Sequence, residues 1–460
     1  MANHKDKMYK LLHDAYYGDG MFYDGSALIK HERESIKNYR RRRKLAYYLN
    51  YVGPIVDCSV LPVFNDEIKR DYNDTAKFKL FLEDVDRAGT SLQDFMSRQA
   101  VAAKLYGVVY IIVNNDAVLG ESDADNIANR SLPFLTAIEP KDVIGWHFDE
   151  RGILKDFAYK GKFYDDDGWH TRQYAWTTEK WEVKDEYGKL IRSGTHNLKR
   201  VPVVQWFGRN TDPRRVLPVP EFISIVQTNY HIYHLCSLLN QISDNQTFNI
   251  LTMQSTGQGL TDVTIGTNNL LVYPQDTNAP QFIAPDAGPA TVLMEQITRL
   301  VSEMYRMSGL NSVIGVESAK SGLAKKWDFE RTNKNLVNFS VQCEKAEKAI
   351  IALYELWSGE SIDYVCEYPR DFNVDDVADC LAQAQQAIDL GVGSKTFKLE
   401  VAKKVLESYM PNLPPETYDM IINELEAAQD DLDKSAAFGE GEMLGDRTDQ
   451  DNDPRIRGAD

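Results

Sequence analysis

The sequence predicts an α+β fold in which long helices alternate with antiparallel β-rich insertions. Apolar residues recur at spacings of three and four over several long stretches, which is the period of an amphipathic helix. Aromatic and polar residues alternate between Asp156 and Arg192, which is the period of a half-buried strand. Hydrophobic residues make up 43% of the 460 residues, which is enough for real cores over about two to four domains.

The composition limits the class of protein. The formal net charge is −17 at pH 7, which argues against a tight, sequence-independent grip on DNA, because such a grip needs a basic face. A protein that surrounds DNA without holding it stays open. The five cysteines show no Cys-x-x-Cys spacing, so we expect reduced thiols. Neither a signal peptide nor an apolar stretch of about 20 residues is visible, so we expect a soluble protein made inside a cell, with no membrane partner.

The N-terminal 50 residues are polar and rich in tyrosine. The stretch RESIKNYRRRRKLAYYLNYVGPIVD indicates a helix that Pro54 ends or kinks. Its basic run, Arg40 to Lys44, allows two interpretations. A helix face that pairs with the many acidic residues is favoured over a contact with nucleic acid.

A second helical region and a strand follow. The pattern predicts a helix, a break at Gly89, and another helix with Thr90 or Ser91 as its N-cap. Gly107 then leads into a β-rich run from Val108 to Val113.

From Leu132 to Phe207 the pattern changes to short strands. Within this region, the stretch from Asp156 to Arg192 predicts an antiparallel meander, with turns at Asp167-Gly168 and Tyr187-Gly188. The turn YDDDGWH lacks the spacing and the closing Glu of a calcium loop, so no metal is expected there. The stretch KRVPVVQWFGRN predicts one more strand.

A long helix is predicted after Pro218 and Pro220, with apolar residues on more than one face, as in a helix packed on several sides. His231 and His234 share this helix, but no third ligand is visible, so packed or interface histidines are favoured over a metal site. Residues 245 to 290 carry no helix signal and indicate short strands. A second helix then places Leu293, Ile297, Leu300 and Met304 on one stripe.

A loop rich in glycine and serine separates this helix from the next one, within the stretch RMSGLNSVIGVESAKSGLAKKWDFERTN. Ser321 is a candidate N-cap for a long amphipathic helix that runs to Trp357. Its apolar stripe consists of Phe329, Leu336, Phe339, Cys343, Ala346, Ile350, Leu353 and Trp357.

The C-terminal part predicts a short strand, IDYVCEYP, followed by helices and an acidic tail from about residue 433 that we expect to be disordered. GVGSKTF departs from the phosphate-binding loop pattern, because a serine separates Gly393 from Lys395. Gly391 closing one helix and Ser394 capping the next is the favoured interpretation. The sequence shows no catalytic motif and no zinc ligand set, so we expect neither an enzyme nor a cofactor.

The order of these elements resembles the portal proteins of tailed double-stranded DNA bacteriophages, over most of the chain. The matching stretches are GTSLQDFMSRQAVAAKLYGVVYIIV, KRVPVVQWFGRN before PVPEFISIVQTNYHIYHLCSLLNQ, MYRMSGLNSVIG with SGLAKKWDFERTNKNL, and EYPRDFNVDDVADCLAQAQQAIDLGVGSKT. None is a diagnostic motif by itself, so the resemblance depends on their ordered series.

The resemblance implies a ring, usually of twelve subunits, at one capsid vertex, with a central channel for genome packaging and ejection. It assigns parts of the chain by position. These are the wing (1–217), a stem helix (218–246), the clip (247–289), a second stem helix (290–308), the tunnel loop (309–321), a long wing helix (322–358), the crown (359–432) and the acidic tail (433–460).

The tunnel loop would be the narrowest part of the channel, where it must yield to moving DNA. The residues expected to act there are Gly309, Asn311, Ser312, Gly315, Ser318, Lys320, Ser321, Lys325 and Lys326. The glycines leave the backbone free, the serines and the asparagine offer short polar contacts, and the lysines offer positive charge to phosphate. For the lysines, a solvated start of the next helix is an equally good interpretation.

The partners that the resemblance implies are copies of the chain, DNA without sequence specificity, terminase, a head-completion or adaptor protein, the major capsid protein and a scaffold protein. The location would be the virion, after assembly in the host cytoplasm. A strongly acidic ring would repel DNA, so the DNA would slide. Three alternatives stay open. They are a different head–tail connector protein, a nucleic-acid enzyme with an unrecognised carboxylate site, and a helical scaffold without a DNA role.

Overall fold

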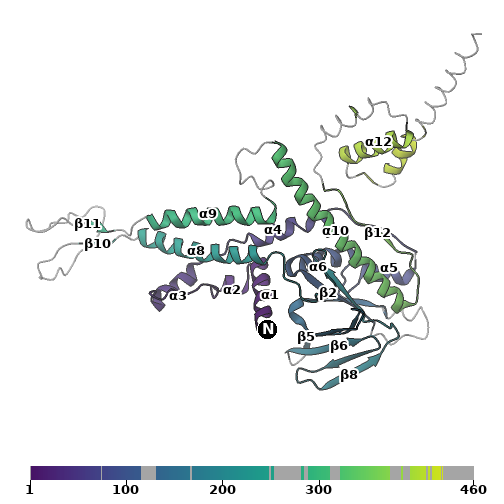
Figure 1. Ribbon diagram of the computed structural model, residues 1–460, viewed down its shortest axis with the longest axis horizontal. Helices are drawn as coiled ribbons and strands as arrows, with labels where there is room; N and C mark the ends of the chain where they lie inside the picture. Colours follow the sequence, from purple (N-terminus) through teal and green to yellow (C-terminus); the bar gives the residue numbers. More distant parts are fainter. Residues whose placement is uncertain are drawn as a thin grey trace, which may run out of the picture. The chain divides into compact units, whose positions relative to one another are not determined.

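The computed structural model describes residues 2–73, 75–115, 131–165, 168–247, 250–252, 281–283, 288–310, 322–372, 394–410 and 417–425, with a few isolated positions between them. The chain forms two compact units, Met1–Phe372 and Asn373–Asp460. Helices and antiparallel sheets make up the first unit, which confirms the α+β prediction (Figure 1). Among the helices of the described residues, none is both long and apolar enough to span a membrane.

A three-stranded antiparallel sheet lies at the centre of the first unit, with the order β3-β2-β9. Its strands are β2 (Val108–Asn114), β3 (Phe134–Ile138) and β9 (Val203–Phe207). All seven residues of β2 are buried. Val109, Ile111 and Val113 belong to a core made with helices, whereas Val108, Tyr110 and Ile112 belong to a second core made with other strands. A strand covered on both faces needs the uninterrupted apolar run that the sequence shows there.

The predicted meander is confirmed as a five-stranded antiparallel sheet in chain order. Its strands are β4 (Val143–Phe148), β5 (Leu154–Asp165), β6 (Gly168–Thr177), β7 (Lys180–Lys184) and β8 (Leu190–Thr195). Phe157, Tyr159 and Trp176 pack against the even-numbered residues of β2, so the aromatic alternation reflects one buried sheet face. Gly188 has φ of +85°, which fits the predicted turn before β8.

The N-terminal helices build the helical core together with α6. They are α1 (Ala2–Tyr17), α2 (Gly20–Tyr23), α3 (Ile36–Leu45), α4 (Val52–Cys58), α5 (Ala76–Glu83) and α6 (Leu92–Tyr106). Ser91 caps α6, since its hydroxyl accepts from the Asp94 N–H at 3.1 Å, and Gly107 ends α6 with φ of +83°. Ser91 is one of the two predicted N-caps, whereas Gly107 was predicted only as the residue that leads into β2.

The predicted helix through residues 33–57 is wrong in its middle. The helix stops at Leu45, and residues 46–51 separate it from α4. Pro54 does not end or kink a helix but lies in the first turn of α4. Proline is tolerated at such a position, because the N–H groups of a first helical turn have no partner within the helix.

The basic run on α3 pairs with acidic groups, as favoured from the sequence. Arg41 forms an ion pair with Asp244 at 2.6 Å. The buried Arg42 binds both carboxylate oxygens of Glu34 at 2.8 and 2.9 Å and donates to the Ser237 hydroxyl at 3.0 Å. The hydrogen bonds from Arg42 lower the pKa of Glu34 below its ordinary value. The run therefore joins α3 to the helix that contains Ser237 and Asp244.

That helix is α8 (Ile223–Thr247), and it lies antiparallel beside α9 (Gly288–Ser308) (Figure 1). The helix α8 packs against α1, α3, α4 and α9, as predicted for a helix packed on several sides, and its buried residues lie before Asn240. Between α8 and α9 the described residues form one short pair, β10 (Ile250–Thr252) with β11 (Gln281–Ile283). Of the other residues assigned to the clip, Thr247 ends α8 and Gly288 and Pro289 begin α9, and the rest lie outside the described residues. The second helix starts two residues before the predicted position 290, with Pro289 in its first turn.

The longest helix is α10 (Gly322–Ser358), which confirms the predicted long helix. Its stripe from Leu336 to Leu353 is buried, and the Trp357 indole donates to the Val113 carbonyl at 2.7 Å. The first unit continues to Phe372, because β12 (Val365–Glu367) pairs with β1 (Lys69–Asp71). Residues 359–372, which the resemblance assigns to the crown, therefore pack with the first unit.

A buried ion pair fastens α10 to these two strands. Glu347 is fully buried and binds the Arg70 guanidinium through both oxygens, at 2.9 and 3.0 Å. The hydroxyls of Tyr364 and Tyr368 donate to the same carboxylate at 2.5 and 2.6 Å. Burial and the charge of Glu347 raise the pKa of both tyrosines, so both stay neutral donors. The sequence analysis did not predict β1, whose three polar residues carry no period.

In the second unit, the structure describes α12 (Lys395–Tyr409) and a helical segment at 417–425. The Ser394 hydroxyl accepts from the Phe397 N–H at 3.3 Å, which confirms Ser394 as an N-cap. Gly391, most of the helix predicted before it, and the tail lie outside the described residues.

Candidate functional site

The structure describes the base of the predicted tunnel loop. Gly309 directly follows the last residue of α9. Lys325 and Lys326 lie in the first turns of α10, but their side chains are outside the described residues. The other predicted residues, Asn311, Ser312, Gly315, Ser318, Lys320 and Ser321, also lie outside the described residues. The structure therefore shows how the chain is held at the start of the loop.

The start of the loop is fixed by a helix-terminating turn. Gly309 has φ of +79°, and its N–H donates to the Arg306 carbonyl at 3.3 Å. The Leu310 N–H donates to the Tyr305 carbonyl at 3.1 Å. This pair of bonds is the Schellman motif, which needs a residue that tolerates positive φ at the position of Gly309. Leu310 is only 2% exposed, so the chain is held by burial just before residue 311.

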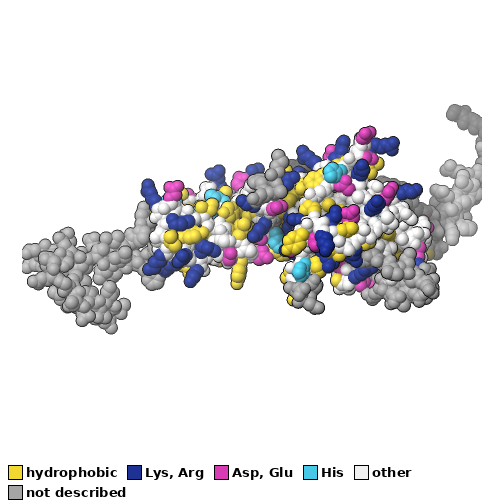
Figure 2. Space-filling model, turned by 90° about the horizontal axis from the view of Figure 1, so that it is seen from below, with side chains coloured by type: hydrophobic (Ala, Val, Ile, Leu, Met, Phe, Trp, Pro, Cys, Tyr) yellow, Lys and Arg dark blue, Asp and Glu magenta, His cyan; other side chains and the backbone are white. Residues whose placement is uncertain are grey.

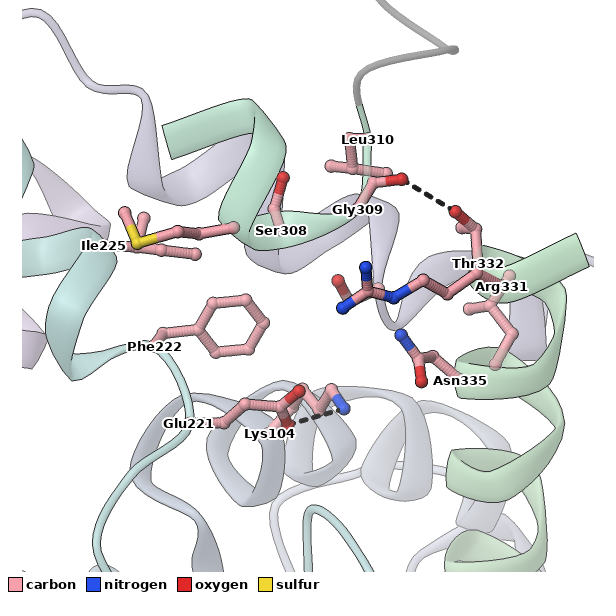
Figure 3. A pocket seen from close by; sticks show the side chains of 13 residues that line it. Lys104, Glu221, Phe222, Ile225, Ser308, Gly309, Leu310, Arg331, Thr332 and Asn335 are labelled. Atoms are coloured by element: carbon pink, nitrogen blue, oxygen red, sulfur yellow. Dashed lines mark hydrogen bonds and ion pairs between the residues drawn. The ribbon is translucent and has the colours of Figure 1, made fainter. Parts of the chain in front are cut away.

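A hydrogen bond joins this turn to α10. The Thr332 hydroxyl donates to the Gly309 carbonyl at 2.9 Å (Figure 3). Thr332 lies ten residues after the start of α10, which is about 15 Å along the helix. Residues 311–321 therefore connect a fixed point beside Thr332 to the start of α10, which lies about three helical turns away from Thr332. We call Gly309, Leu310 and Thr332 the loop anchor.

The loop anchor borders a pocket of about 220 Å³ between α6, the start of α8, the end of α9 and α10 (Figure 3). On its floor the Lys104 ammonium binds the Glu221 carboxylate at 2.9 Å, and Lys104 is 5% exposed. The ammonium also lies 5.2 Å from the centre of the Phe339 ring, a distance that allows a cation–π contact. Through these two contacts Lys104 of α6 joins the turn before α8 and the helix α10.

Arg331 is the further cation at this site. Its side chain points into the pocket (Figure 3), and within the described residues it makes no hydrogen bond or ion pair. The cations expected from the sequence are Lys320, Lys325 and Lys326, and Arg331 was not among them. The available signal was its position next to Thr332, on the side of α10 that the apolar stripe leaves polar.

The site offers charge and shape but no recognisable catalytic constellation among the residues described. No group of three or more His, Cys, Asp or Glu side chains in this part of the chain is placed to hold a metal ion. His234 is half-buried, and burial together with Arg42 lowers its pKa, as suits a packed histidine. The four cysteines that the structure describes are free thiols. The arrangement can hold a loop at its base and present positive charge beside it.

The anchor can be tested by mutation. Replacing Thr332 by valine should lower the free energy of unfolding by about 1 kcal/mol, because the Gly309 carbonyl loses its donor. Gly309→Ala should cost about as much, through backbone strain at positive φ, since the new Cβ meets nothing closer than 3.9 Å. Urea unfolding followed by tryptophan fluorescence measures both. Thr298→Val on α9 is the control, because its exposed hydroxyl bonds only within its own helix. If neither change exceeds the control, the anchor contributes nothing.

The far half of the α8–α9 pair leaves apolar surface uncovered. Beyond Ser237, no described residue of α8 is fully buried. Large hydrophobic side chains are exposed on α9 and on or just after α3: Val292 (64%), Met294 (56%), Ile36 (62%), Leu45 (50%) and Tyr47 (53%). Figure 2 shows hydrophobic side chains between Lys and Arg side chains at the α3 end of this region. Clustered apolar side chains of this size usually mark a contact surface.

Comparison with known proteins gives weak structural similarities. No protein-family model and no curated protein matches the chain. A chain in the neck of an empty gene transfer agent (GTA) particle, computed with C6 symmetry, is 11% identical over 75% of this chain and 87% of that chain, with a TM-score of 0.43. A chain in the virion of a native GTA particle is 10% identical over 74% and 85%, with a TM-score of 0.44.

A third similar structure is the neck of a native GTA particle computed with C12 symmetry. Its chain is 9% identical over 86% of this chain and 94% of that chain, with a TM-score of 0.41. Similarities of this size do not assign the chain to a family.

Proposed function

We propose that the chain is a portal protein of a tailed double-stranded DNA phage or a related particle. The observation that carries this proposal is the helix pair α8–α9, with β10–β11 at one end and the loop anchor at the other. In this arrangement one end of a helical stem faces a clip, and the other end holds a loop beside a long crossing helix. The same order of elements underlies the resemblance seen in the sequence.

The proposed function needs a homo-oligomeric ring. A helix pair buries apolar side chains on its facing sides and leaves the outer sides to solvent or to another subunit. The exposed hydrophobic residues of α9 and α3 lie on such outer sides, and a neighbouring copy of the chain would cover them. Isologous or open contacts would also hide them, but a closed ring fits a channel protein.

In this ring, residues 311–321 of each subunit would project toward the channel from the loop anchor. Lys320, Lys325, Lys326 and Arg331 would offer positive charge to passing phosphates, within a ring that is acidic elsewhere. DNA would contact a few weak charges and slide past an acidic wall. The role is structural, and cleavage of plasmid DNA by the purified protein with divalent metal would contradict it.

The partners belong to the same proposal. The clip would face terminase during packaging and a head-completion or adaptor protein afterwards. The major capsid protein and a scaffold protein would contact the outer parts of the ring, which would lie at one vertex of the virion.

Ring formation predicts the effect of two charges on α9. Val292→Glu with Met294→Glu should abolish the large oligomer and leave a folded monomer, because both side chains are exposed in the single chain. The two positions differ by about 200° around the helix, so at least one faces a neighbour. Light scattering after size exclusion measures the mass, and far-UV circular dichroism checks the fold.

Ile153→Glu is the matched control, since Ile153 is 58% exposed and lies in the turn between β4 and β5, away from the helix pair. It should leave the oligomer intact. An unchanged oligomer in the double variant would show that α9 is not an interface.

A further inference from the structure

Among the described strands, none pairs with the side of β9 that faces away from β2, which we call its free edge. In the order β3-β2-β9, strand β9 pairs only with β2 among the described strands. The Val113 N–H donates to the Pro202 carbonyl at 3.0 Å, and the Gly208 N–H donates to the Gly107 carbonyl at 3.1 Å. In an antiparallel ladder, hydrogen-bonded pairs alternate, so the even-numbered residues of this segment face β2. The N–H and C=O groups of Gln205 and Phe207 therefore point away from β2.

The sequence of this edge carries no charge and no proline that would protect it against pairing. The residues of β9 are Val-Val-Gln-Trp-Phe, with no proline and no charged side chain. Natural edge strands are commonly protected by charge, proline, a bulge or a covering element. Here the register with β2 is regular over all five residues. The edge keeps the geometry that accepts a further strand.

A pocket of about 500 Å³ runs along the free edge. Val204 lines it from one face of the sheet, and Gln205 and Phe207 line it from the other, so the pocket surrounds the edge. Lys345 and Ala349 of α10 form one wall, and Ile153 from the turn between β4 and β5 forms part of the opposite wall. An extended segment lying along β9 would have a wall on each side for its alternating side chains.

The rim of this pocket carries two unpaired cations. Arg200 and Lys345 are exposed, and within the described residues neither makes an ion pair or a hydrogen bond. The side-chain amide nitrogen of Gln205 is buried without an acceptor. A buried donor without a partner costs free energy that an incoming carbonyl oxygen would recover.

We propose that the free edge of β9 binds an extended acidic peptide segment of a partner protein as an added strand. The main-chain groups of Gln205 and Phe207 pair with the backbone of the segment, which supplies affinity with little dependence on its sequence. Arg200 and Lys345 meet its carboxylates and select acidic segments over basic ones. The site belongs to a single chain, so it does not depend on the proposed ring.

The test uses three synthetic peptides labelled with a fluorophore: Ser-Val-Glu-Val-Glu-Val-Ser, its counterpart with lysine in place of glutamate, and Ser-Val-Glu-Pro-Glu-Val-Ser. Fluorescence anisotropy with the full chain should show the acidic peptide binding at least tenfold more tightly than the other two. The proline removes a backbone donor from the added strand, and the lysines reverse the charge. Hydrogen exchange at the amides of Gln205 and Phe207 should slow at least tenfold when the acidic peptide is bound.

Two sets of variants separate the edge from non-specific attraction. Arg200→Glu with Lys345→Glu should reverse the preference between the acidic and basic peptides, and both positions are exposed, so the fold should persist. Lys155→Glu with Lys189→Glu changes the same charge on the exposed meander and should leave binding unchanged. The proposal is overturned if no peptide binds at millimolar concentration, if the control pair abolishes binding equally, or if binding leaves exchange at Gln205 and Phe207 unchanged.

Discussion

Replacing Glu347 by alanine should lower the free energy of unfolding of the first unit by about 3–5 kcal/mol. The change leaves the Arg70 guanidinium, whose side chain is 9% exposed, without its counter-charge. It also removes the acceptor of the Tyr364 and Tyr368 hydroxyls. The loss should appear as a lower midpoint in urea unfolding followed by tryptophan fluorescence. A change of this size is several times the cost of removing an exposed ion pair.

Glu344→Ala is the matched control, one turn earlier on the same helix. Glu344 binds Lys348 and Arg370, which are 47% and 44% exposed, so its loss should cost about 0–1 kcal/mol. Glu347→Gln should fall between the two, because an amide keeps an acceptor for the tyrosines but not the charge for Arg70. Equal midpoints for Glu347→Ala and Glu344→Ala would show that the buried pair does not fasten α10 to β1 and β12.

Shortening the loop should leave ring assembly intact but reduce DNA packaging or retention at least tenfold. The position of the loop anchor sets the smallest number of residues that can replace residues 311–321. The chain must span about 15 Å from Leu310 to the start of α10, so about five extended residues are needed. Replacing residues 311–321 by Gly-Ser-Gly-Ser-Gly therefore keeps the anchor and both helices while removing reach into the channel. The readout is the fraction of DNA-filled particles in a complementation assay.

A replacement of the same residues by an eleven-residue Gly/Ser linker is the control for length. It keeps the length of the loop but removes Lys320 and the other side chains. It therefore separates contacts that the loop backbone makes with DNA from contacts that depend on charged side chains. Normal packaging and retention by the five-residue variant would contradict the assignment of this loop to the channel.

The sequence predicted correctly those features that depend on a single residue or on a regular spacing of apolar residues. Ser91 caps α6 as expected, because capping depends on the residue at a single position. The apolar run of β2 and the stripe of α10 also indicated burial correctly. The prediction for Pro54 was wrong, because proline is compatible both with the end of a helix and with its first turn, and the sequence does not distinguish the two.

Other features depend on tertiary contacts that no period reveals. Strand β1 exists because β12 pairs with it and because Arg70 reaches Glu347. A carboxylate at position 347 within an apolar stripe was the available signal for a buried pair. Of the predicted loop residues outside α10, the structure describes Gly309, and beside it lie Thr332 and Arg331, which the sequence did not indicate.

The measurement that tests the central claim most directly is the native mass of the purified chain, by light scattering after size exclusion. The proposed ring predicts a species of about 629 kDa, from 12 × 52.4 kDa, or one that differs by a single subunit. A dimer or trimer as the largest species, at every concentration tested, would contradict the ring and with it the proposed portal function.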